Sequence, residues 1–176
     1  MILTADEIRT HVADGTITIT PFDAAMLNPN SYNYHLGPTL RVYPQGAHDS
    51  LHPPATEETE IPPAGLVLQP GRLYIGNTVE CIGSSSFVPS LIGRSSLGRL
   101  GMYLQLSADL GNLGASHQWT LEITVVQPLR VYPGMVCGQV SFWVASGEVS
   151  LYGGLLGTLS PPTVPTAMTM RKVLDQ

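Results

Sequence analysis

The stretch GRSSLGRLGM, residues 93–102, gathers residue types that bind anions. Arg94 and Arg99 lie there around two serines and without an acidic neighbour, in a chain that has only eight lysines and arginines. Guanidinium and hydroxyl groups donate hydrogen bonds to phosphate, and glycine lets a backbone approach a ligand closely. The stretch therefore predicts a phosphate-binding loop. A glycine-rich connection whose arginines pair with carboxylates elsewhere would have the same composition, because neither a Walker nor a GxGxxG pattern is present.

Glu122 is the candidate for proton transfer. It lies in WTLEITVV, residues 119–126, where its neighbours are nearly all apolar or β-branched and no basic residue is close in sequence. A carboxylate on a mostly buried strand is destabilising unless it is paired or protonated. A general base tuned by partial burial and a nearby arginine would explain its presence. The alternative is that Glu122 occupies the polar face of an alternating, half-exposed strand.

The residue pattern does not indicate a metal centre. Cys81 and Cys137 are isolated, so the chain offers neither a disulfide framework nor a CxxC pair, and this suits a reducing cytoplasm. His35 and His117 could ligate a metal or act as bases. Lone histidines are more often polar residues of the surface or core, which is the role we predict for both.

Charge and hydropathy exclude two classes of partner. A formal net charge of −5 leaves no basic stripe with which to follow a nucleic-acid backbone. No apolar run approaches the length of a membrane span, and the first fifteen residues lack a signal-peptide core. We therefore expect a soluble, cytoplasmic protein that binds neither nucleic acid nor membrane.

The elements that must position these residues are mostly strands. Thr4 and Glu7 match a capping box and Gly15 can end a helix, so a short helix is predicted at the start of the chain. The remaining sequence, with its 18 glycines and 15 prolines, alternates short strand-like runs with turns. This favours an all-β sandwich, jelly roll or barrel in a single domain, residues 1–176. Strands are predicted at residues 16–20, 32–36, 39–43, 65–68, 73–77, 102–107, 119–126 and 137–145.

Two segments are predicted to lie outside this framework. Residues 47–63 are acidic and contain prolines, which indicates an exposed excursion with Glu57, Glu58 and Glu60 in a solvated loop. Residues 159–176 begin with three prolines in nine positions, which indicates an extended or mobile tail.

The two chemical stretches, taken together, resemble the dCTP deaminase and dUTPase superfamily, and the deaminase branch most. The arginine-serine loop is followed, after 22 residues that separate Arg99 from Glu122, by the strand that carries the glutamate. Further matches in order along the chain are MILTADEIR, TITITPFD, NPNSYNYHLG, LQPGRLYIGNTVE and YPGMVCGQVSF. The resemblance implies a distorted jelly-roll fold of the dUTPase-like β-clip type. It also implies homotrimers with active sites between subunits that act on pyrimidine deoxynucleotides.

The resemblance implies roles for particular residues. Arg94, Ser95 and Ser96 would contact phosphate or hold the site together. Arg99 would orient and charge-balance Glu122, and Glu122 would carry protons, so the implied catalytic set is Glu122, Arg99 and Ser95. The further substrate-binding residues that it implies are Asn112, Trp119, Thr120, Leu121 and Tyr152, with backbone groups of residues 119–121 facing the base edge. As side chains, Tyr32, Tyr34 and Trp119 could stack on a base, but packing inside the β-fold is the role that we predict for them.

Hydrolytic deamination at C4 of cytosine needs an activated water, protonation of N3 and departure of ammonia. One carboxylate within reach of all three can carry each proton in turn. The H-x-E and P-C-x-x-C arrangement with which zinc deaminases make hydroxide is absent from this sequence. We therefore expect Glu122 to work without a metal, helped by donors such as Ser95. Mg²⁺ is expected only on the substrate phosphates.

Several positions depart from the family pattern. Asn33 stands where the family usually has an aspartate, and His35 where it usually has an arginine. Asn112 also replaces an aspartate, and an amide cannot take a proton from water. After Tyr152, the segment YGGLLGTLSPPTVPTAM lacks the lysine and glutamine of the family's closing arm.

These departures leave three functions open. The predicted function is metal-independent deamination of a cytosine nucleotide, with dCTP converted to dUTP and ammonia. A non-catalytic or altered-substrate pyrimidine nucleotide-binding trimer is the first alternative, and a dUTP diphosphatase is the second. Combined measurement of ammonia and pyrophosphate release would separate them.

Overall fold

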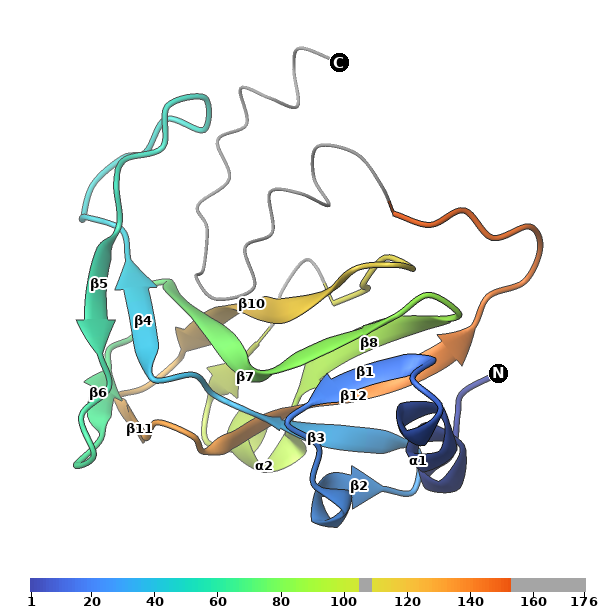
Figure 1. Cartoon of the computed structure of the whole chain (residues 1–176). Coiled ribbons are helices and arrows are strands. Elements are labelled where there is room, and N and C mark those ends of the chain that lie inside the picture. Colours follow the sequence, from blue (N-terminus) through green and yellow to red (C-terminus); the bar gives the residue numbers. More distant parts are fainter. Residues whose placement is uncertain (105–108, 153–176) are drawn as a thin grey trace.

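A computed structural model describes residues 1–104 and 109–152 (Figure 1). Within these ranges the chain forms antiparallel sheets of six and four strands and a separate pair of short strands. The six-stranded sheet has the order β5-β4-β7-β10-β9, with β1 also paired to β7, and the four-stranded sheet has the order β2-β3-β12-β8. The predicted all-β, jelly-roll class with a short N-terminal helix is confirmed.

The bounds of the strands are as follows. The six-stranded sheet contains β1 (Ile17–Thr20), β4 (Thr39–Val42), β5 (Glu57–Glu60), β7 (Tyr74–Ser84), β9 (Met102–Tyr103) and β10 (Ser116–Val125). The four-stranded sheet contains β2 (Leu27–Asn28), β3 (Ser31–His35), β8 (Phe87–Gly93) and β12 (Val136–Val144). The short pair is β6 (Leu66–Leu68) with β11 (Leu129–Val131). The helical elements are α1 (Ala5–Ala13), a 3₁₀ turn (Ala24–Met26) and α2 (Ser95–Arg99).

Helix α1 forms where the sequence predicts it, but not with the predicted cap. Thr4 is the N-cap residue, yet its side chain makes no capping hydrogen bond. Asp6 and Glu7 lie in the first turn, where their charges complement the helix dipole. Ile8 is fully buried against the core. The helix therefore forms through apolar burial and favourable end charges, and the capping box is a wrong prediction.

Four strands, β2, β5, β8 and β11, lie in segments that the sequence did not predict as strands. The acidic run, predicted as a solvated loop, is the edge strand β5, whose residues are all exposed. Arg41 on β4 is opposite Glu58 in the register and donates to its carboxylate at 2.9 Å, which stabilises this pairing. Strand β8 contains Pro89, which argues against a central strand, but β8 is an edge strand and tolerates it. Of the strand predicted at 102–107, residues 102–103 are observed and 105–108 lie outside the described residues.

Side chains of both large sheets share one core. Leu121 and Ile123 of β10 and Phe142 of β12 are fully buried within it. Tyr32 and Tyr34 of β3 are also buried, and Tyr34 donates its hydroxyl to the carbonyl of Ile92 at 3.0 Å. The packing role predicted for these two tyrosines is confirmed.

Over the described ranges, the structure has no helix that is long and apolar enough to cross a membrane.

Candidate active site

The arginine-serine stretch folds as the turn between β8 and β9 and includes the five-residue helix α2 rather than an open loop. Its first turn closes on Arg94, whose carbonyl accepts from the backbone N–H of Leu97 and Gly98. Ser95, Ser96 and Arg99 are exposed, whereas Arg94 is half-buried. The hydroxyls and one guanidinium are therefore accessible to a ligand, as the sequence predicts.

This turn is anchored to the C-terminal end of β10. The carbonyl of Gly101 accepts from the N–H of Val126 at 2.9 Å, and the carbonyl of Leu100 accepts from Gln127 Nε2 at 3.1 Å. Gly101 has φ +87°, and a Cβ there would lie 2.5 Å from the Val126 side chain. Glycine is thus required at this position both by conformation and by space.

Glu122 lies in the middle of β10, opposite Ile75 of β7. Its neighbours Leu121 and Ile123 point into the core, while Glu122 alternates to the other face and is half-buried. The strand is therefore an alternating, half-exposed one, which is the alternative that the sequence left open for Glu122. A half-exposed carboxylate at this place is accessible to water and to a ligand.

Arg99 and Glu122 are not brought together within one subunit. Glu122 precedes Val126, where the turn is anchored, by four residues, which corresponds to about 13 Å of strand. In the view of Figure 1, α2 lies near the bottom of the molecule, whereas β10 lies above β7. Among the described residues, the ion pairs do not include one between Arg99 and Glu122.

Trp119 packs within the fold, and both its indole and its backbone N–H are hydrogen-bonded. Its indole N–H donates to the carbonyl of Ile82 at 2.8 Å, and its backbone N–H donates to Thr78 Oγ1 at 2.9 Å. The ring also packs closely over Gly111, where an added Cβ would lie 2.5 Å from it. The packing role is confirmed, and the backbone N–H is already bonded to Thr78 rather than available to a base. Next to it, Thr120 is half-buried on β10.

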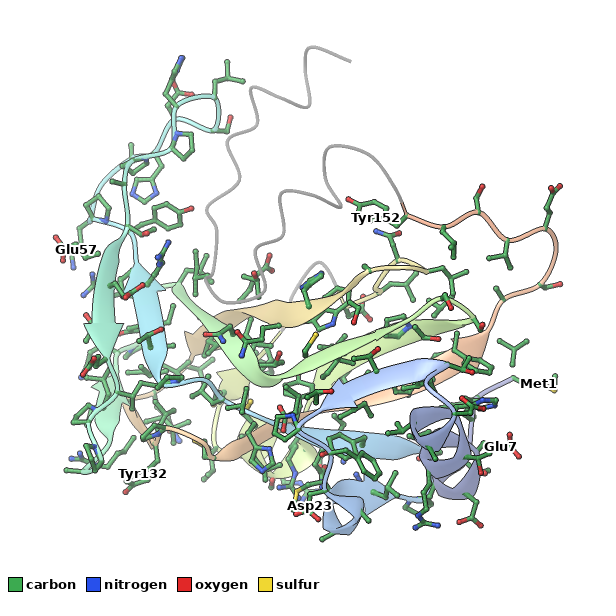
Figure 2. The ribbon with its side chains drawn as sticks, in the orientation of Figure 1. Met1, Glu7, Asp23, Glu57, Tyr132 and Tyr152 are labelled. Atoms are coloured by element: carbon green, nitrogen blue, oxygen red, sulfur yellow. The ribbon has the colours of Figure 1, made fainter. Side chains whose placement is uncertain are left out.

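Asn112 and Tyr152, two further predicted substrate-binding residues, line one cavity of about 440 Å³. Tyr152 is held there by its backbone N–H, which donates to the carbonyl of Leu113 at 2.6 Å (Figure 2). The lining residues are Val88, Leu110, Gly111, Asn112, Leu113, Ser150, Leu151 and Tyr152. The structure thus joins two residues that are forty positions apart. The predicted tail, residues 159–176, lies outside the described residues.

The deeply buried carboxylate of the described chain is Glu80, which sequence reasoning did not single out. Glu80 lies on β7 and is only 1% exposed to solvent, and its carboxylate is hydrogen-bonded to His35 of β3. The signal was present, because Glu80 lies within YIGNTVECIG, a strand as apolar as the one that holds Glu122. Asn33, on the same strand as His35, accepts from Asn28 at 3.0 Å and from Gln139 at 3.2 Å.

No group of three or more histidine, cysteine, aspartate or glutamate side chains in residues 1–104 and 109–152 is arranged to hold a metal ion. His117 instead lies against the ring of Trp119, with centroids 4.4 Å apart, and its Nδ1 is 2.9 Å from the carbonyl of Gln118.

The sequence is similar to a known protein family and to several of its members. Residues 2–145 match the family model described as dCTP deaminase-like. A dUMP-forming dCTP deaminase of Leptospira biflexa serovar Patoc is 44% identical over 152 residues, which cover 86% of this chain and 87% of that protein. One of Clostridium beijerinckii is also 44% identical, with the same coverage of 86% and 87%. A dCTP deaminase of Rhodopirellula baltica is 43% identical over 84% of this chain and 74% of its own.

Among solved structures, the crystal structure of 2'-deoxycytidine 5'-triphosphate deaminase from Agrobacterium tumefaciens has a similar fold. The TM-score is 0.65 at 21% sequence identity, over 82% of this chain and 48% of that chain. At this identity the likeness concerns the fold alone, and the present chain spans about half of that protein.

Proposed function

Because this chain belongs to the dCTP deaminase-like family, we propose that it is an enzyme that hydrolyses the C4–amino bond of cytosine in dCTP and releases ammonia. The observation that carries the proposal is the family match over residues 2–145, which spans both the arginine-serine turn and Glu122. The relatives from Leptospira biflexa, Clostridium beijerinckii and Rhodopirellula baltica, which match over most of their length, are named as dCTP deaminases.

In this proposal Glu122 is the proton carrier. Its carboxylate takes a proton from the attacking water and delivers it to N3. It then takes the proton of the C4 hydroxyl in the tetrahedral intermediate and delivers it to the amino group, which leaves as ammonia. The half-exposed position on β10 leaves the side chain accessible to a base that lies along the strand. Ser95 and backbone groups would hold the water and stabilise the tetrahedral intermediate.

We place the active site between subunits of a homotrimer. Arg94, Ser95, Ser96 and Arg99 of one subunit would meet Glu122 of a neighbour, because α2 and the middle of β10 lie on different sides of a single subunit. Exposed apolar side chains around α2 support an interface there, since monomers rarely leave such groups in contact with water together. They are Leu100, Tyr103 and Val126.

The remaining nucleotide contacts would come from the cavity that holds Asn112 and Tyr152 and from the backbone of Thr120 and Leu121. Asn112 is exposed at the mouth of this cavity and its amide can donate to a sugar hydroxyl or a phosphate oxygen. No metal is required for the chemistry in this account, and Mg²⁺ would bind only to the substrate phosphates. The two cysteines are unpaired thiols, which supports a cytoplasmic location.

A second candidate product is dUMP, and the names of the Leptospira and Clostridium relatives favour it. Forming dUMP would require hydrolysis of the triphosphate after deamination. For that hydrolysis, Asn112 cannot act as the base, because its amide cannot take a proton from the attacking water.

One assay separates these functions. The protein is incubated with dCTP, and ammonia and pyrophosphate are measured in the same samples. Ammonia without pyrophosphate indicates dUTP as product, whereas equal amounts of the two indicate dUMP. Pyrophosphate from dUTP without any ammonia from dCTP would indicate a diphosphatase. Nucleotide binding without either product would leave a binding protein and refute the proposal.

A further inference from the structure

The buried pair of His35 and Glu80 links the two large sheets. Glu80 lies on β7 of the six-stranded sheet and His35 on β3 of the four-stranded sheet. The backbone N–H of His35 donates to Glu80 Oε2 at 2.9 Å, and the imidazole Nδ1 is hydrogen-bonded to Glu80 Oε1. A buried carboxylate is tolerated only when hydrogen bonds or an opposite charge compensate it, and His35 supplies both bonds.

Glu80 belongs to an irregular part of β7. Gln118 is paired with Cys81 and Thr120 with Asn77, so residues 78–80 of β7 are opposite Trp119 alone. We call residues 78–80 the β7 bulge. Such extra residues bend a strand and re-aim the side chains that follow.

Toward β10, the β7 bulge is held by side-chain hydrogen bonds instead of ladder bonds, and on its other side Thr78 forms a backbone bridge with Leu36. Thr78 Oγ1 donates to the carbonyl of Glu80 at 2.7 Å and accepts from the N–H of Trp119 at 2.9 Å. Gln118 Nε2 donates to the carbonyl of Val79 at 2.8 Å. Each bulge residue therefore contacts β10 or another residue of the bulge, and Glu80 is the one whose side chain is bonded to the second sheet.

The surroundings of Glu80 reach the arginine-serine turn as well. Burial raises the pKa of the Cys137 thiol, the negative charge of Glu80 raises it further, and the charge of Arg94 opposes both. Tyr32 and Tyr34 are also within electrostatic range of the carboxylate. Glu80 and Arg94 therefore both lie within electrostatic range of the Cys137 thiol.

We propose that His35 and Glu80 are positioning residues for the deamination: they hold the β7 bulge, which sets the register and aim of Glu122 on β10. The activity part of this inference rests on the proposed function. Regular pairing resumes at Thr120, two residues before Glu122, so relaxation of the bulge would shift or turn the carboxylate. Misplacement of a catalytic group by about 1 Å can lower a rate by about a hundredfold.

The test compares His35→Leu and His35→Arg, with His11→Leu on α1 as a matched control. His35→Leu removes the bond from the ring to Glu80, whereas His35→Arg supplies a side-chain donor for the carboxylate. His11 contacts Asp14 and Glu7 on its own side of the molecule and the ring of Phe87 on β8, but it makes no contact with Glu80. The first readout is amide hydrogen exchange of Trp119, measured by NMR without nucleotide. The second is kcat and KM for ammonia release from dCTP.

We expect His35→Leu to speed exchange at the Trp119 amide by about tenfold and to lower kcat by about tenfold or more, with KM changed less than about threefold. His35→Arg should keep the exchange rate of the Trp119 amide and kcat near their wild-type values, and His11→Leu should change neither quantity. Unchanged exchange in His35→Leu would overturn the inference, and so would faster exchange with a wild-type kcat. Failure of His35→Arg to restore kcat in a folded protein would also overturn it.

The inference can still be tested if His35→Leu does not fold or if the wild-type protein releases no ammonia. If His35→Leu does not fold, Glu80→Gln takes its place, because the amide has similar volume but only one oxygen to accept the two bonds from His35. Exchange at Trp119 should then increase by about threefold or more, and a wild-type rate would refute the inference. If the wild-type protein releases no ammonia, the proposed function fails, and the claim about the β7 bulge is decided by the exchange comparison alone.

Discussion

Gly138 of β12 faces the ring of Tyr34 so closely that a Cβ at Gly138 would lie 2.0 Å from Tyr34 Cζ. Gly138 is buried, and the Tyr34 hydroxyl that lies beside it is bonded to the carbonyl of Ile92. Three neighbouring strands, β3, β12 and β8, meet at this contact. The small size of one residue therefore fixes the place of a large ring in the core.

This contact predicts that Gly138→Ala destabilises the protein. The added methyl must displace the Tyr34 ring, and such overpacking lowers the free energy of unfolding by about 1–3 kcal/mol or more. Gly98→Ala is the matched control, because a Cβ there meets nothing within 4 Å. Thermal or urea unfolding of both variants measures the difference. Equal stability of Gly138→Ala and the wild type would show that the ring can move freely.

The two cysteines should differ in reactivity. Burial, helped by the charge of Glu80, raises the pKa of the Cys137 thiol, so less thiolate is present there at a given pH. Cys81 is partly exposed. In the folded protein at pH 8, a thiol reagent should label Cys81 quickly and Cys137 only after unfolding, and Cys81→Ser should abolish the fast reaction. Rapid labelling of both thiols without denaturant would contradict the buried position of Cys137.

Much of the fold could be predicted from local patterns, and the failures have physical reasons. Strict alternation in TITIT marks β1, and a glycine with positive φ follows α1 as predicted. The acidic strand β5 was missed because its pairing depends on the distant Arg41. Strand β8 was missed because the sequence does not reveal that Pro89 lies at a sheet edge.

The candidate site was predictable in its residue types but not in its arrangement. The composition of residues 93–102 identified an exposed, donor-rich turn. The local sequence left open whether Glu122 is partly buried or on the polar face of a half-exposed strand; β10 alternates there, and Glu80 is the buried acid. Burial depends on which face of a strand meets the second sheet, and residue types along one strand do not determine that.

Mixed oligomers test whether sites form between subunits. Arg99→Ala and Glu122→Gln should each be inactive alone, since each removes one part of every site. If a site takes Arg99 from one subunit and Glu122 from its neighbour, random mixing in equal amounts should restore about one quarter of wild-type activity. The mixture is prepared by joint refolding or coexpression, and ammonia release is measured. Mixtures as inactive as the separate variants would indicate that both residues act from the same subunit.

Removal of divalent cations should weaken substrate binding without abolishing the chemistry. If Mg²⁺ binds only to the phosphates, a chelator should raise KM for dCTP and leave kcat at saturating substrate nearly unchanged. Ammonia release with excess chelator and a titration of dCTP measures both constants. Loss of kcat that only Zn²⁺ restores would contradict a mechanism in which Glu122 carries the protons unaided.

The central claim is that this chain deaminates dCTP with Glu122 as its proton carrier. The most direct measurement is single-turnover ammonia release from dCTP by the wild type and by Glu122→Gln, with nucleotide binding measured by calorimetry on the same samples. The variant keeps the size of the side chain but cannot cycle a proton, so the rate should fall by about 10²–10⁴-fold while binding is retained. Ammonia release by Glu122→Gln at the wild-type rate, or none from the wild type, would contradict the account.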